Sequence, residues 1–146
     1  MIKLLMKLFI NKKTMFDMMT YKVSTSSKIE EIVANVETSC KNNNFALLHH
    51  YIYHDIVKSK GFPINRKVFI YEICVAKVAA LVLTEEPSIA PFMPCRIAIY
   101  EENDSVVIST QNMKMILDTL DKNSELFQST SELFHKLKSL LNEIKG

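Results

Sequence analysis

Glycine is nearly absent from this sequence. Only Gly61 and the C-terminal Gly146 occur among 146 residues, whereas Walker-type phosphate loops and dinucleotide-binding fingerprints each need several glycines close together. The composition therefore excludes both nucleotide-binding motifs. Long apolar runs are lacking as well, because lysines interrupt the hydrophobic N-terminal segment. That segment is too short for a membrane span of about 20 apolar residues, and no small-residue cleavage site of a secretory signal follows it.

Cysteine is sparse and poorly spaced for metal binding. There are three cysteines, an odd number, and they lie far apart in the sequence without a CxxC pair: Cys40, Cys74 and Cys95. A zinc finger and a disulfide-stapled secreted fold are therefore not expected, and the reducing cytoplasm is the predicted compartment. The net charge of +2 is too small for an electrostatic nucleic-acid binder, so no nucleic-acid partner is predicted.

The first twenty residues differ from the rest of the chain. At helical spacing, Lys3, Lys7, Asn11 and Thr14 form one polar stripe, and large apolar residues fill the remaining circumference. We expect residues 1–20 to form an amphipathic helical extension that packs on its own domain or on a second subunit. The alternative is contact with a membrane surface. Because one small domain can cover only one side of such a helix, the sequence predicts a homodimer or higher homo-oligomer.

Residues 21–146 are predicted to form a single α+β domain. Short segments rich in β-branched and aromatic residues predict strands, namely 21–25, 46–53, 66–74, 96–100 and 105–110. The last two flank the polar turn Glu101–Asp104 and predict a hairpin. We expect a two-layer sandwich, with a small mixed or mostly antiparallel sheet of about five strands and helices packed on one face.

Capping patterns and apolar periodicity predict the helices. Ser27 with Glu30, and Ser129 with Glu132, match the S-x-x-E capping box that opens a helix. The first predicted helix carries Cys40 on its apolar stripe and ends at Asn42–Asn44, since Asn tolerates the left-handed cap conformation. A buried apolar helix is expected at 75–84, a stiff extended loop with three prolines at 85–94, and a short helix near 113–120.

Two cysteines are candidates for a site. Cys74 ends a predicted strand directly before a helix, whose N-terminal end favours a thiolate. Cys95 follows Pro94 at the start of the next strand, beside Arg96, which can bind an anion or stabilise a thiolate. If both strand ends lie on one edge of the sheet, the two sulfurs are neighbours. The alternative is that both are buried structural cysteines.

Three further side chains are weaker candidates. Glu72 lies inside a predicted central strand, where a carboxylate is either part of an ion pair or a site acid. His50 and His54 share one face of the strand but lie roughly 13 Å apart at strand rise, too far to bind one metal ion. A single histidine can still serve as an axial haem ligand, although a half-buried or surface histidine is the commoner case. No metal site is predicted.

The stretch 70–100 resembles the domain of unknown function 302 family. The resemblance is carried by Glu-x-Cys, an alanine-containing helix, an acidic-Pro loop and Pro-Cys-Arg-Ile before Tyr-Glu, found here at Glu72, Cys74, Ala79, Leu83, Pro87, Pro94, Cys95, Arg96, Ile97, Tyr100 and Glu101. It extends more loosely over 21–141. The Asn-Pro usual after the first cysteine is Val75-Ala76 here. The resemblance implies a two-layer α+β fold, often dimeric, with no established activity and some association with sulfur metabolism.

Two functions remain open from the sequence. The first is a non-enzymatic module that holds a small-molecule ligand, with haem as one specific version, between the sheet and its helices. The alternative is a thiol-dependent redox or sulfur-handling protein that uses Cys74 as nucleophile and Cys95 as resolving or anion-positioning partner. The ligand-binding candidates are Cys74, Cys95, Arg96, Glu72, His54 and His50.

Overall fold

Five antiparallel strands form one sheet in the computed structural model, which describes residues 12–146. The strands are β1 (Thr20–Thr25), β2 (Ala46–Ile52), β3 (Val68–Cys74), β4 (Cys95–Glu102) and β5 (Ser105–Gln111). Their order across the sheet is β1-β5-β4-β3-β2, and every neighbouring pair is antiparallel. The predicted hairpin is β4–β5, with Asn103 at a positive φ of 54° in its turn.

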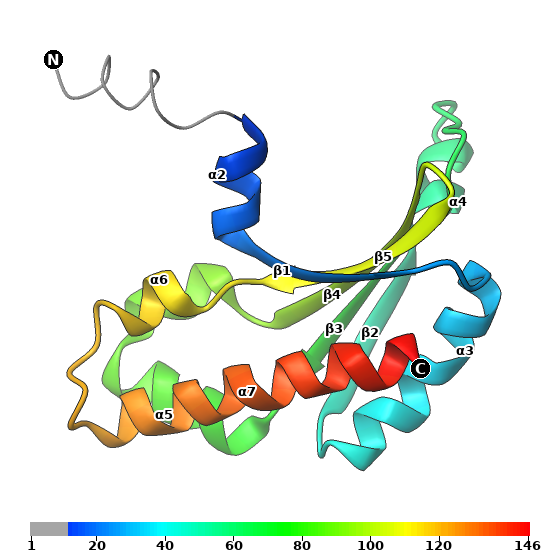
Figure 1. The fold of residues 1–146 in the computed structure, drawn as a ribbon. Helices are drawn as coiled ribbons and strands as arrows, with labels where there is room; N and C mark the ends of the chain where they lie inside the picture. Colours follow the sequence, from blue (N-terminus) through cyan, green and yellow to red (C-terminus); the bar gives the residue numbers. More distant parts are fainter. Residues whose placement is uncertain (1–11) are drawn as a thin grey trace, which may run out of the picture.

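The helices include two long ones that cover the same face of the sheet. They are α2 (Lys12–Met19), α3 (Ile29–Asn42), α4 (Tyr53–Ser59), α5 (Ala76–Glu85), the 3-10 helix η1 (Pro87–Phe92), α6 (Lys114–Leu117) and α7 (Glu125–Lys145). In Figure 1, α3 and α7 lie side by side along one face, while α5 and α6 lie at one end of the sheet. The predicted α+β fold, with helices on one face, is confirmed.

The core lies between the sheet and its two long helices. Alternate strand residues point inward, so Ile73, Ile97 and Ile108 are 0% exposed. The predicted apolar stripe of α7 meets them, with Leu140 and Leu141 also fully buried. Full burial of one such side chain contributes about 1.5–3 kcal/mol. This periodic burial fixes which face of the sheet the helices cover.

Both predicted capping boxes are wrong. Helix α3 begins at Ile29 with Lys28 as N-cap and no side-chain cap, while the hydroxyl of Ser27 bonds with Thr25 instead. Helix α7 begins five residues before the predicted site, and the amide of Phe127 donates to Ser124 Oγ at 3.0 Å. The buried residue Leu126 extends the apolar stripe of α7 toward its N-terminus, which favours the earlier start.

The segment that follows β3 also differs from expectation. Of the residues in α5, only Val82 is buried, and Leu83 is 49% exposed. This helix packs chiefly on η1 and α7, at the end of the sheet, so its outer side meets solvent. The predicted extended loop is instead η1, because Pro87 occupies its first turn, where the missing N–H removes no helical hydrogen bond.

The N-terminal helix α2 extends away from the body of the protein (Figure 1). It comprises the second part of the predicted helical extension, and residues 1–11 lie outside the described part of the chain. Its large apolar side chains Met15, Phe16, Met18 and Met19 are each about half exposed. Within residues 12–146, no helix is both long and apolar enough to cross a membrane.

Candidate functional site: an apolar cavity beside two thiols

A small cavity lies where β3 ends and β4 begins, between the sheet, α5, η1 and α7. Its volume is about 60 Å³. A cavity needs roughly 10–15 Å³ for each water that it holds, so this space admits about four waters or an organic molecule of about four heavy atoms. The apolar side chains that line it are Ile73, Val75, Val78, Ala79, Val82, Ile89, Phe92, Met93, Pro94, Met113, Ile116 and Leu133. We call this space the inner cavity.

Cys74 and Cys95 both line the inner cavity. Cys95 pairs with Ile73 across the two strands, which places Cys74 one residue farther along the same edge. Burial, and secondarily the neighbouring Cys74, raises the pKa of Cys95 from 9.0 to about 11, against a smaller lowering by Arg96. At pH 7 only on the order of one Cys95 side chain in 10,000 is therefore a thiolate. Cys40 lies elsewhere, buried in α3 as expected.

Thr130 supplies a hydroxyl to the same cavity. The residue is 5% exposed, and its Oγ1 atom has no hydrogen-bond partner in the described part of the chain. A buried hydroxyl without a partner costs about 1–3 kcal/mol. Thr130 was missed in the sequence because the predicted helix began beside it. Once α7 is extended to Glu125, Thr130 is a polar residue within the apolar stripe of Leu126, Leu133 and Leu137.

Glu72 and Arg96 face away from the inner cavity. They are cross-strand partners in β3 and β4, on the opposite pleat from the fully buried Ile73 and Ile97. The Arg96 Nε atom lies 3.6 Å from Glu72 Oε1, and neither residue lines the cavity. Glu72 therefore forms an ion pair with Arg96 outside the inner cavity.

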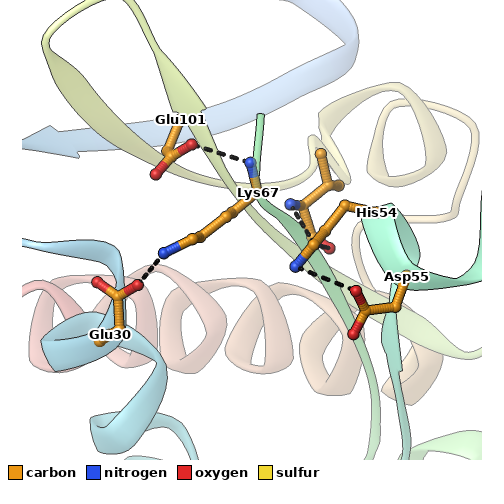
Figure 2. Close-up of polar contacts among 6 residues, drawn as sticks. Glu30, His54, Asp55, Lys67 and Glu101 are labelled. Atoms are coloured by element: carbon orange, nitrogen blue, oxygen red, sulfur yellow. Dashed lines mark hydrogen bonds and ion pairs between the residues drawn. The ribbon is translucent and has the colours of Figure 1, made fainter. Parts of the chain in front are cut away.

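The two candidate histidines lie at the far end of β3 and on the edge strand β2. His54 Nδ1 accepts a hydrogen bond from the amide of Val68 at 3.1 Å, and its Nε2 atom is 4.0 Å from Asp55 (Figure 2). The ring of His50 stacks on Tyr71 with centroids 6.0 Å apart. Neither histidine lines the inner cavity. Residues 12–146 contain no group of three or more His, Cys, Asp and Glu side chains that could hold a metal ion.

A polar cluster beside His54 ties β3 to its neighbours. Lys67 bonds through Nζ to Glu30 at the start of α3, while its backbone amide donates to Glu101 at 2.9 Å (Figure 2). The ammonium of Lys67 holds the pKa of Glu30 below its usual value, mainly through this hydrogen bond. Each of these polar groups has a hydrogen-bond or ion-pair partner within the protein, so the cluster stabilises the local structure. The inner cavity is therefore the better candidate for a binding site.

The fold and cavity define a two-layer α+β domain with an internal apolar space at one end of its sheet. The chain belongs to the family described as Domain of unknown function DUF302, whose model matches residues 21–144. It is similar to the crystal structure of the uncharacterized conserved protein DUF302 from Bacillus stearothermophilus, with a TM-score of 0.75 and 25% identity. That match covers 87% of this chain and 98% of the other. No curated protein matches the chain.

Proposed function

We propose that this protein is a non-enzymatic module that binds a small, mostly apolar molecule in the inner cavity. The observation that carries the proposal is the buried Thr130 hydroxyl, which lines an otherwise apolar space and has no partner in the described chain. A ligand with one polar atom would satisfy this hydroxyl while its apolar part fills the remaining volume. Apolar pockets with a few placed polar groups are the usual form of small-molecule sites.

The size of the inner cavity limits the class of ligand. A volume of about 60 Å³ is far too small for a porphyrin, and none of the four histidines lines the space. We therefore confine the proposal to molecules smaller than haem. The simplest probes are xenon, which enters apolar cavities, and 1-propanol, which adds a hydroxyl to a short apolar chain.

The experiment compares the two probes by NMR titration of backbone amides near Ile73, Val78 and Leu133. Both probes should produce saturable shifts in the wild-type protein. Thr130→Val should retain xenon binding but weaken 1-propanol binding roughly 3- to 10-fold, the equivalent of one hydrogen bond. The matched control Thr110→Val alters a buried threonine outside the cavity and should leave both probes unaffected. Absence of saturable shifts with either probe would refute the proposal.

A second candidate function rests on two free thiols in one cavity. The thiolate of Cys74 attacks a small disulfide and releases one thiol. The thiolate of Cys95 then attacks the Cys74 sulfur of the mixed disulfide, which releases the second thiol and leaves a Cys74–Cys95 disulfide, so the substrate is reduced as the two cysteines are oxidised. The raised pKa of Cys95 disfavours it as the first attacking thiol, and it also requires that Cys95 lose its proton before the second step. Free thiols also suit the reducing cytoplasm that we propose as the compartment. Iodoacetamide labelling at pH 7 tests this function, since Cys74 must react in the folded protein. Labelling only after denaturation would contradict it.

Self-association is part of the proposed function. Helix α2 exposes Met15, Phe16 and Met18 by about half, and it packs mainly against β1. We propose that this apolar surface packs against a second copy in a two-fold dimer. Light scattering at micromolar concentration should give a dimer for the full chain and a monomer after deletion of residues 1–19. A full-length monomer that binds liposomes would instead favour the membrane alternative.

A further inference from the structure

The inner cavity adjoins a second apolar space. A groove of about 450 Å³ runs between the end of α2, η1 and α6, lined chiefly by Met19, Ile89, Phe92, Gln111, Met115 and Ile116. We call it the outer groove. Four of these residues, Ile89, Phe92, Gln111 and Ile116, also line the inner cavity. The two spaces are therefore neighbours separated by a few side chains, and Phe92 is one of them.

We propose that the inner cavity and the outer groove together bind an uncharged straight-chain alcohol. This inference rests on the proposed function and names the class of ligand for the same site. The hydroxyl of the ligand bonds to Thr130 Oγ1 in the inner cavity, and its alkyl chain passes Phe92 into the outer groove. The binding is non-covalent and requires no change in the ligand.

The chemistry of the walls favours an uncharged ligand. Among residues 12–146, no Asp, Glu, Lys or Arg lines either space, and the polar groups that do are thiols, hydroxyls and amides. A buried carboxylate or ammonium group needs an opposite charge, which these walls do not supply. A neutral hydroxyl needs only one partner, and Thr130 is available to it.

The dimensions favour an elongated ligand. The inner cavity holds about four heavy atoms, so a longer molecule must extend beyond it. The outer groove shares four wall residues with the inner cavity and has no charged lining residue among residues 12–146, whereas the groove on the other side, which shares Val75, Val78 and Leu133, is lined by charged side chains. Phe92 and Met115 are 56% and 61% exposed, which is high for such large apolar side chains. An alkyl chain in the outer groove would cover them. Each methylene removed from water there should tighten binding about fourfold.

The test is a series of primary alcohols from 1-propanol to 1-octanol, titrated into the full-length protein by NMR. The dissociation constant should fall about fourfold per added carbon, and sodium octanoate at pH 8 should bind at least tenfold more weakly than 1-octanol. Met115→Ser should weaken 1-octanol binding several-fold and leave 1-propanol binding unchanged. Leu83→Ser, which alters an exposed apolar residue outside both spaces, serves as the matched control and should change neither.

Four results would overturn this inference. If 1-propanol binds but longer alcohols bind no more tightly, the proposed function stands and the elongated ligand is wrong. The elongated ligand is also wrong if Met115→Ser weakens 1-propanol binding as much as 1-octanol binding. It is wrong as well if alcohols dissociate the dimer as they bind, because a second copy of the chain then occupies the outer groove. If no alcohol and no xenon binds, the proposed function fails as well.

Discussion

Two buried threonines with opposite hydrogen bonding allow a sharp test of the inner cavity. Thr130 Oγ1 has no hydrogen-bond partner among the described residues 12–146, whereas Thr110 Oγ1 donates to the carbonyl of Arg96 at 2.7 Å. Both residues are at most 5% exposed. Substituting Val keeps the shape of each side chain and removes the hydroxyl. Thr and Val also have similar helix propensities, so Thr130→Val changes the backbone preference of α7 little.

The expected effects have opposite signs. Thr130→Val removes a buried polar group that lacks a partner, so the free energy of unfolding should rise by about 1–2 kcal/mol. Thr110→Val removes a formed hydrogen bond and should lower the free energy of unfolding by about 1 kcal/mol. At roughly 4 °C per kcal/mol for a domain of this size, Tm should rise by about 4–8 °C in the first variant and fall by about 4 °C in the second.

The assay is urea unfolding followed by circular dichroism, with calorimetry for Tm. The variants must share the wild-type dependence of unfolding free energy on urea, which shows that only stability has changed. If Thr130→Val destabilises the protein as much as Thr110→Val does, the Thr130 hydroxyl has a partner in the folded protein. The reasoning for a polar ligand atom at that position would then be refuted.

Three further predictions follow from the core, the helix cap and the buried thiol. Leu140→Ala, in the fully buried stripe of α7, should lower the free energy of unfolding by about 2–5 kcal/mol, while Leu83→Ala should cost under about 1 kcal/mol in the same urea titration. Ser124→Ala should lower that free energy by about 1 kcal/mol through loss of the α7 cap, and Ser129→Ala should not. Because burial raises the pKa of Cys95 from 9.0 to about 11, the folded protein retains this proton more tightly than the unfolded chain does. The stability from Cys95 is therefore complete below pH 9 and lost as pH rises toward 11, and Cys95→Ala should flatten that part of the measured pH profile.

Periodic burial made most of the fold predictable. The apolar stripes of α3 and α7 and the β-branched strands each indicate one buried face, and the structure places those faces together. The predicted capping boxes were wrong because the S-x-x-E pattern also occurs away from the N-cap position. Ser27 lies before the N-cap of α3, and Ser129 lies inside α7. The prediction that α5 is buried was wrong because apolar content alone does not show whether a helix lies over the sheet or at its end.

The candidate site was only partly visible in the sequence. The ends of neighbouring antiparallel strands meet at one edge, so the closeness of Cys74 and Cys95 could be predicted from strand boundaries alone. The role of Thr130 could not, because a lone threonine in an apolar stripe usually bonds to its own helix. Its lack of a partner depends on how α5, η1 and α7 pack together, and no local pattern encodes that arrangement.

A crystal structure of the full-length protein soaked with 1-propanol tests the central claim most directly. The proposal predicts one alcohol molecule in the inner cavity, its oxygen about 2.7–2.8 Å from Thr130 Oγ1 and its carbon chain directed toward Phe92. The same soak of Thr130→Val should show weaker density or a different orientation. An inner cavity that contains only water in the wild-type protein, with 1-propanol bound elsewhere or not at all, would contradict the account.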